Sequence, residues 1–80
     1  MPKVIVYSTQ TCPYCHQAKD FLKANKIAFT DIDVSKDEAK AQEMMRKSGQ
    51  IGVPVLDIDG TIIIGFDKAA IAKALKLKAK

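Results

Sequence analysis

Residues 3–34 contain two apolar runs of the β type, KVIVY and IAFTDIDV, separated by a stretch with helical spacing. The first run is nearly continuous in hydrophobicity, which is typical of a central strand covered on both faces. A strand, a helix and a second strand in this order predict two parallel strands joined by a right-handed crossover. Since 80 residues can build only one such core, we expect a single domain spanning residues 1–80.

Local signals set the expected bounds of the first two helices. The first helix should run from Pro13 to Asn25, a residue suited to a left-handed C-cap. Ser35, with Glu38 three residues later, predicts a capping box at the start of a second helix that ends near Lys47. The apolar stripe of this second helix is expected to consist of Ala41, Met44 and Met45.

The last third of the chain predicts a hairpin and a final helix. The runs VLDID and GTIII read as two short strands joined by a turn at Asp59 and Gly60. Asp67 can cap the final helix. Its core face is expected to comprise Ala70, Ile71, Ala74 and Leu75. The predicted fold is therefore α/β with the order βαβαββα, a four-stranded mixed sheet flanked by three helices.

Composition and charge narrow the class of protein, its expected location and its expected partners. The chain is 48% hydrophobic and 28% charged, an ordinary globular balance. The start MPKVIVYS has no signal-peptide pattern, and no apolar run approaches the roughly 20 residues that cross a bilayer, so we expect a cytoplasmic protein without a membrane partner. The net charge of +4 is most concentrated in the tail, which we interpret as a solvated helix end and not a nucleic-acid site. The tail lysines are Lys73, Lys76, Lys78 and Lys80.

The reactive side chains gather in TCPYCH, residues 11–16. Pro13 suits the first position of a helix, which places Cys12 at the N-cap. There the unpaired N–H groups of the first turn and the positive end of the helix dipole favour the thiolate over the thiol. Cys15 lies inside the first turn and is near enough to attack a mixed disulfide formed at Cys12. We therefore predict Cys12 as the nucleophile and Cys15 as the resolving cysteine.

A Cys-x-x-Cys spacing also occurs in metal and haem sites. A structural zinc ion needs four ligands, and His16 and carboxylates are the only obvious partners for the two cysteines, so we predict no metal. Cys12, Cys15 and His16 together match the attachment pattern of c-type haem. Haem attachment, however, goes with export and with a largely helical pocket. We expect no bound cofactor, and His16 is interpreted as an exposed helical residue.

The sequence resembles the glutaredoxin family, which has the thioredoxin fold, over essentially its whole length. The resemblance rests on TCPYC at 11–15, GVP at 52–54 and GFD at 65–67. It implies a glutathione-dependent thiol–disulfide oxidoreductase that reduces protein disulfides and glutathione mixed disulfides through Cys12 and Cys15. The implied partners are glutathione as co-substrate and disulfide-containing or glutathionylated proteins, with the chain acting as a monomer.

The same resemblance implies a groove for glutathione beside the cysteines. In this family the proline of the Val-Pro pair is cis, so a cis bond is expected between Val53 and Pro54. A residue ahead of such a bend can offer its backbone N–H and C=O to an extended peptide. By resemblance, Val53 pairs with the cysteinyl backbone of glutathione and Asp67 accepts from its α-ammonium group. The implied glutathione-binding residues are Tyr14, Val53, Pro54, Phe66 and Asp67.

Several positions depart from the family pattern. Thr9 stands where many glutaredoxins carry a lysine that can pair with the glycyl carboxylate, and Lys47 and Gln50 are the candidates to replace it. Gly52 replaces the usual threonine, and Ile64 replaces the first glycine of the usual Gly-Gly pair.

Three alternative functions follow from these departures and from the motif itself. The GF pair at 65–66 is similar to glutaredoxin-like redoxins that thioredoxin reductase reduces and that donate electrons to ribonucleotide reductase or another protein disulfide. A second alternative is a dimer that shares an iron–sulfur cluster between two copies of Cys12 with glutathione. The third is a domain that binds partners in the Val53–Pro54 groove without redox chemistry.

Overall fold

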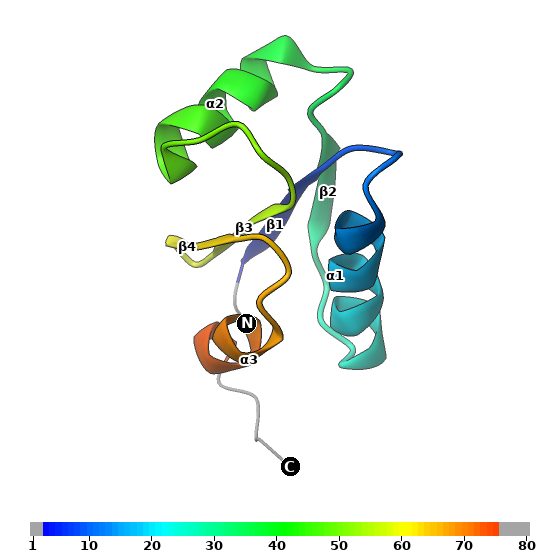
Figure 1. Ribbon diagram of the computed structural model, residues 1–80. Coiled ribbons are helices and arrows are strands. Elements are labelled where there is room, and N and C mark those ends of the chain that lie inside the picture. The colour runs from blue at the N-terminus through cyan, green and yellow to red at the C-terminus, as the bar shows by residue number, and fades with distance from the viewer. Residues whose placement is uncertain (1–2, 76–80) are drawn as a thin grey trace.

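The computed structural model describes residues 3–75, and the tail lysines Lys76, Lys78 and Lys80 lie outside this range. The elements are β1 (Val4–Ser8), α1 (Pro13–Ala24), β2 (Thr30–Asp33), α2 (Glu38–Ser48), β3 (Val55–Ile58), β4 (Thr61–Ile64) and α3 (Lys68–Ala74). The strands form one mixed sheet in the order β2-β1-β3-β4 (Figure 1). Strand β1 is parallel to β2 and antiparallel to β3, and β3 is antiparallel to β4. The predicted thioredoxin-like α/β fold is confirmed.

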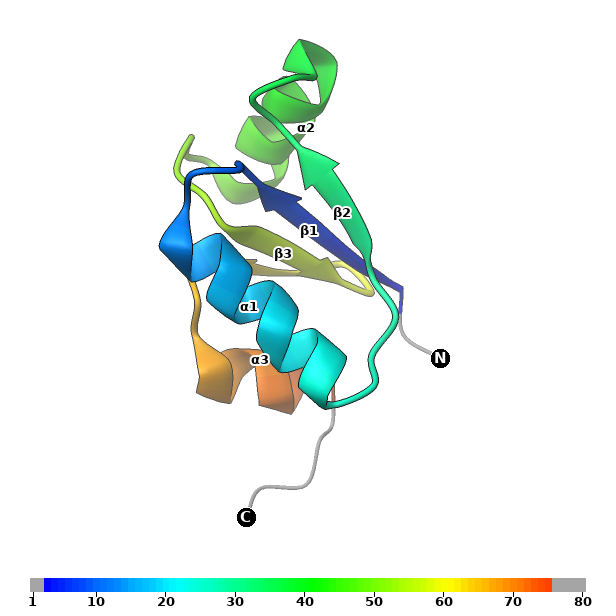
Figure 2. The same cartoon turned by 90° about the vertical axis from the view of Figure 1, so that its right-hand side faces the viewer.

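The sheet is the middle layer of the molecule. Figure 2 shows α2 on one face and α1 with α3 on the other. Because side chains alternate along a strand, Val4 and Val6 of β1 pack toward α1 and α3, whereas Ile5 and Tyr7 pack toward α2. The cluster under α1 and α3 contains the buried residues Val4, Val6, Ala18, Leu22, Leu56, Ile58, Ile63, Ile71 and Leu75. The cluster under α2 contains the buried residues Tyr7, Met44 and Val55.

The hairpin between β3 and β4 has the predicted turn. Asp59 and Gly60 have φ angles of 50° and 90°, both positive, as the two central residues of a type I′ turn require. The carboxylate of Asp57 accepts a hydrogen bond from the Gly60 N–H at 2.8 Å, which closes the turn. The Asp59-Gly60 pair therefore sets the register of the two strands.

The predicted end of the first helix is wrong in one detail. Asn25 is the C-cap of α1, but its φ of −96° is not left-handed. Lys26 takes the left-handed conformation instead, with a φ of 58°. The Asn25 side-chain amide donates to the Phe21 carbonyl at 2.9 Å, and the same carbonyl accepts from the Asn25 backbone N–H at 3.2 Å.

The expected second strand is shorter than its apolar pattern predicts. Ile27 and Phe29 lie before β2 and pack, partly buried, against the cluster under α1 and α3. These two residues are therefore apolar because they pack beneath the helices, although they lie outside the strand that pairs with β1.

The predicted cap of the second helix is also wrong. Asp37, and not Ser35, is the N-cap of α2, and its carboxylate accepts from the Lys40 N–H at 3.1 Å. Ser35 instead donates its N–H and its hydroxyl to the Asp33 carboxylate in the preceding turn. Within the expected stripe of α2, Met44 is buried but Met45 is exposed.

No helix within residues 3–75 is long and apolar enough to cross a membrane.

Candidate active site

Cys12 is the N-cap of α1, as the sequence predicts. Its backbone is extended, with φ −96° and ψ 110°, and Pro13 occupies the first helical position. The Cys12 sulfur accepts a hydrogen bond from the Cys15 N–H at 3.2 Å. A sulfur in this position satisfies one of the free N–H groups of the first turn and lies at the positive end of the helix dipole.

The two cysteines differ in exposure. Cys12 is partly exposed, whereas Cys15 is completely buried, and both are free thiols. Burial, together with the hydrogen bond to Cys12, raises the pKa of Cys15 to about 12, while the Thr9 backbone and the Lys19 charge act in the opposite direction. A partner from solvent therefore meets Cys12 first, and Cys15 is a thiol until a reaction at Cys12 draws it in.

The Val53–Pro54 bond is cis and lies against the nucleophile. The Cys12 sulfur is 3.8 Å from the Val53 carbonyl oxygen, within reach of a thiol hydrogen bond. The Gly65 N–H donates to the Pro54 carbonyl at 2.8 Å, which ties the start of β3 to the end of β4. Gly65 has a φ of 81°, a conformation that favours glycine and turns the chain toward α3.

The segment before the cis proline is held by a side chain. The Gln50 amide accepts from the Gly52 N–H at 2.6 Å and donates to the Gly52 carbonyl at 2.9 Å. A Cβ added at Gly52 would lie 2.7 Å from the Gln50 side-chain oxygen. The glycine at this position, which sequence reasoning noted as a departure, therefore makes room for Gln50 to brace the chain ahead of Val53.

A groove of about 500 Å³ lies at the junction of α1, the cis proline and the start of α3. All five residues predicted for it are among its lining residues, which are Tyr14, Val53, Pro54, Ile64, Gly65, Phe66, Asp67 and Lys68. The lining residues come from three segments that are distant in the sequence. The pairing of β1 with β3 and of β3 with β4 brings these segments to one end of the sheet. Sequence reasoning missed Lys68, whose position beside Asp67 is the only signal that could have found it.

The start of α3 forms one wall of the groove. The Asp67 carboxylate caps this helix by accepting from the Ala70 N–H at 3.1 Å, which confirms the predicted cap. Phe66 packs edge-on against Phe21, with ring centroids 6.2 Å apart. The wall is therefore fixed both by a cap and by aromatic packing onto α1.

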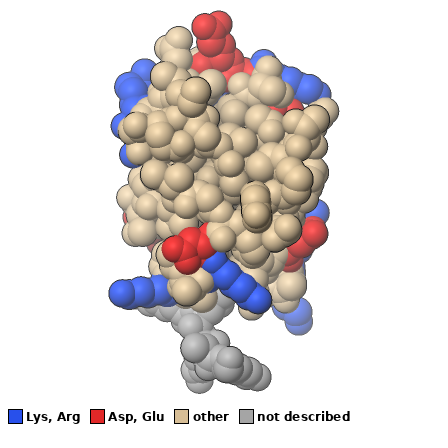
Figure 3. All heavy atoms as spheres, viewed as in Figure 1, with Lys and Arg blue, Asp and Glu red and all other residues tan. Residues whose placement is uncertain are grey.

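The surface around the groove has few charges. Figure 3 shows that the face seen in Figure 1 is mostly uncharged at its centre and charged at its rim. Three of the large apolar side chains that are exposed, Tyr14, Ile51 and Ile64, line the groove or lie just ahead of Val53. This neighbourhood suits contact with apolar or backbone groups of a partner more than a strongly ionic one.

A family model for glutaredoxin matches residues 4–63 of the chain. The chain belongs to the glutaredoxin family. Glutaredoxins are thiol–disulfide oxidoreductases, and this chain is an enzyme of that class. The buried and the accessible cysteine described above provide the dithiol that this chemistry uses.

Named relatives and solved structures agree with this assignment. A glutaredoxin-like 8.6 kDa protein from the rubredoxin operon of Clostridium pasteurianum is 48% identical over 71 residues, which cover 89% of this chain and 95% of that protein. Glutaredoxin 3 of Escherichia coli K12 is 39% identical over 67 residues, covering 84% of this chain and 81% of the relative. The crystal structure of the thioredoxin-like protein BC3987 superimposes with a TM-score of 0.85 at 32% identity, over 90% of this chain and 99% of that one.

Neither candidate substitute for the missing family lysine points into the groove of this glutaredoxin. Lys47 lies on the opposite face of the sheet, where its ammonium donates to Asp57 at 2.7 Å and to the Tyr7 hydroxyl at 2.9 Å. Gln50 is engaged with the backbone of Gly52. Among the lining residues the cation is Lys68, at the Asp67 end of the groove.

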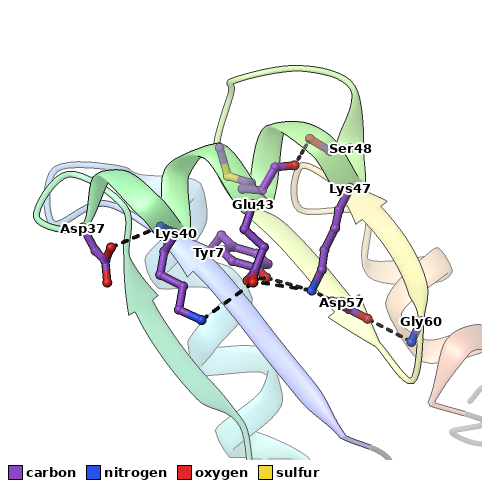
Figure 4. Close-up of polar contacts among 9 residues, drawn as sticks. Tyr7, Asp37, Lys40, Glu43, Lys47, Ser48, Asp57 and Gly60 are labelled. Atoms are coloured by element: carbon purple, nitrogen blue, oxygen red, sulfur yellow. Dashed lines mark hydrogen bonds and ion pairs between the residues drawn. The ribbon is translucent and has the colours of Figure 1, made fainter.

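The contacts of Lys47 belong to a polar network under α2 (Figure 4). The Tyr7 hydroxyl donates to Glu43 and accepts from Lys47, and Lys47 forms an ion pair with Asp57. Burial and the contact with Glu43 raise the pKa of Tyr7. The hydrogen bonds to Asp57 and Tyr7 raise the pKa of Lys47, so this network holds its charges at neutral pH.

His16 lies on the exposed side of α1, as predicted. Its ring Nε2 is 2.9 Å from the Gln10 carbonyl oxygen, so it braces the loop between β1 and α1. Within residues 3–75, no group of three or more His, Cys, Asp or Glu side chains is placed to hold a metal ion.

Proposed function

We propose that this glutaredoxin uses glutathione to reduce protein disulfides and glutathione mixed disulfides through Cys12 and Cys15. The observation behind the proposal is that the lining of one groove unites all five predicted glutathione-binding residues beside the Cys12 sulfur. Glutathione would be a co-substrate and not a bound cofactor. We also propose a cytoplasmic place of action, because in a reducing compartment a pair of cysteines is more often catalytic than a permanent structural disulfide.

The proposed cycle begins with the Cys12 thiolate. It attacks one sulfur of the substrate disulfide, forms a Cys12 mixed disulfide and releases the other sulfur as a thiolate that takes a proton from solvent. With a protein disulfide, Cys15 then loses its proton and attacks Cys12, which releases the second substrate thiol and leaves a Cys12–Cys15 disulfide. Two molecules of glutathione reduce that disulfide and become glutathione disulfide. With a glutathionylated substrate, a second glutathione attacks the Cys12 mixed disulfide directly.

The groove offers glutathione contacts of three kinds. The Val53 backbone can add one short rung to an extended cysteinyl group, as a strand edge does for a peptide. Asp67 can accept from the α-ammonium of the γ-glutamyl group while it caps α3, because a carboxylate has two oxygens and its cap contact uses only Oδ1. The Tyr14 ring provides an exposed apolar wall beside Cys12.

Two coupled assays test the proposal. In the first, turnover of a glutathione mixed disulfide is followed with glutathione, glutathione reductase and NADPH. We expect saturable activity, with the KM for glutathione raised in Asp67→Ser, a variant that keeps a side-chain cap for α3 but loses the negative charge. The matched control is Asp37→Ser, which makes the same change at the cap of α2, away from the groove. Equal behaviour of the two variants would remove Asp67 from the glutathione site.

A second candidate function is a redoxin that thioredoxin reductase reduces. It is favoured by Thr9 in place of the family lysine and by the engagement of Lys47 with Asp57. In the second assay, reduction of a protein disulfide is followed with thioredoxin reductase and NADPH. Activity in this assay alone would establish the redoxin and reject the use of glutathione.

A further inference from the structure

A partly buried lysine lies one helical turn beyond the resolving cysteine. Lys19 follows Cys15 by four residues on α1, so the two share a face of the helix. Its side chain is only 15% exposed, which is unusual for a lysine unless its ammonium is paired. The pairing partner is Asp31 of β2, whose Oδ2 lies 3.0 Å from the Lys19 ammonium.

The Asp31 carboxylate is held in turn by the end of β1. Its Oδ1 accepts from the Ser8 hydroxyl at 2.7 Å, and Ser8 is almost completely buried. Ser8 is the last residue of β1 before the loop that leads to Cys12. Lys19, Asp31 and Ser8 therefore join α1, β2 and β1 at the edge of the sheet that is farther from β4 and the groove.

The resolving step needs a stabilised charge at Cys15. The Cys15 sulfur must become a thiolate while still buried, and a buried anion is costly without a nearby cation. We propose that Lys19 is a positioning residue for this step: its ammonium stabilises negative charge on the Cys15 sulfur, a hydrogen-bond acceptor at position 31 keeps the lysine in place, and the negative charge of Asp31 moderates its effect.

Bonds and charges balance without any additional reactant. Cys15 gives its proton to solvent, its sulfur bonds to the Cys12 sulfur, and the bond between Cys12 and the substrate sulfur breaks with the electron pair leaving on the substrate. The groups that act on Cys15 are Cys12 and Lys19 on its own helix, the Thr9 backbone, and Asp31 through its pairing with Lys19. Burial keeps the pKa of Cys15 high, and the Lys19 charge lowers it.

The resolving step can be observed directly with a symmetrical aromatic disulfide that releases a coloured thiolate. In stopped-flow mixing, attack by Cys12 releases one coloured thiolate and attack by Cys15 releases the second. We expect Lys19→Gln to slow the second phase by about threefold to tenfold, because a lost cation lowers the thiolate fraction more than it raises nucleophilicity. The first phase should change by less than about twofold and reports that the variant is folded with a reactive Cys12.

Three further variants separate charge from packing. Lys19→Arg should keep most of the wild-type rate of the second phase, since it keeps the cation. Asp31→Asn leaves Lys19 with a hydrogen-bond acceptor but no counter-charge, so the second phase should become faster. Lys23→Gln, one turn further along α1 at an exposed position, should change neither phase.

The proposal is overturned if the second phase of Lys19→Gln matches that of the wild type. It is also overturned if Asp31→Asn slows this phase as Lys19→Gln does, because a purely structural pair would act in one direction. Should Lys19→Gln fail to show the first phase, Asp31→Asn decides the question: a faster second phase supports the proposal, and an unchanged or slower one overturns it. Neither phase involves glutathione, so the outcome is independent of the electron donor.

Discussion

The two faces of the sheet are stabilised in different ways. Under α1 and α3 lies a continuous apolar cluster of nine buried residues from both helices and three strands. Under α2 the buried cluster has three members, and one of them is Tyr7, whose hydroxyl is part of a network with Glu43 and Lys47. One face is therefore held mainly by apolar burial, and the other depends also on hydrogen bonds and ion pairs.

The chemistry is on the apolar face. Cys12, Cys15 and Asp67 all lie in the first turns of α1 and α3, the two helices that this cluster anchors. A thiolate at a helix N-terminus must be held in place to within a fraction of an ångström, and close apolar packing provides that rigidity. The polar network under α2 contributes no residue to the lining of the groove.

The largest expected effect is the loss of all exchange in Cys12→Ser. Because every step begins or ends at this sulfur, the rate should fall by at least about a thousandfold with protein disulfides and with glutathione mixed disulfides. Both coupled assays measure it, and circular dichroism checks the fold. Substantial exchange by this variant would mean that Cys15 is the nucleophile despite its burial.

The next effect separates the two substrates. Cys15→Ser should lose reduction of protein disulfides, which needs a resolving thiol, and should retain turnover of glutathione mixed disulfides within about tenfold. Parallel rates with the two substrates measure the split. If both activities disappear together, then Cys15 is required in the first step and the assignment of roles is wrong.

The strength of the apolar face is tested by Leu22→Ala. Leu22 is completely buried between α1 and the sheet, so the free energy of unfolding should fall by about 3 kcal/mol. Urea unfolding followed by circular dichroism gives the value. Ala24→Gly, at the exposed last residue of the same helix, controls for helix propensity and should cost less than about 1 kcal/mol. A loss for Leu22→Ala no larger than that of the control would show that the apolar cluster is not what anchors α1.

The smallest effect concerns the polar face and depends on pH. Burial opposes ionisation of Asp57, but hydrogen bonds from Lys47 and Gly60 outweigh it, and the pKa of Asp57 is lowered. A lowered pKa means that the ionised carboxylate stabilises the folded state above the ordinary carboxyl range, and that this stability is lost as pH falls through the folded-state value. Asp57→Asn should therefore lower the free energy of unfolding by about 1 kcal/mol at neutral pH.

This difference between wild type and Asp57→Asn should shrink toward zero in acid. Urea unfolding at neutral and acidic pH measures it, with Asp20→Asn on the exposed side of α1 as the matched control. A difference that persisted in acid would trace the loss to packing of the asparagine and not to the charge. Activity of the folded variant should be unchanged, because Asp57 lies outside the groove.

Most of the fold could be predicted from local sequence signals. The order of strands and helices, the Asp59-Gly60 turn, and Cys12 and Asp67 as helix caps each depend on residues within about four positions of one another. The groove residues were identified by resemblance to a family, and their sequence spacing alone gives no reason for them to meet.

The alternation of elements and the position of the cysteine pair at the start of a helix are encoded locally, because both follow from short-range backbone preferences. The tertiary structure decided the contacts between distant segments: Lys47 with Asp57, Lys19 with Asp31, and the groove itself. The choice of Asp37 over Ser35 as a cap, in contrast, is local, because Ser35 donates to Asp33 only two residues earlier. The contacts between distant segments depend on which polar groups meet once the strands have paired, and no local pattern contains that information.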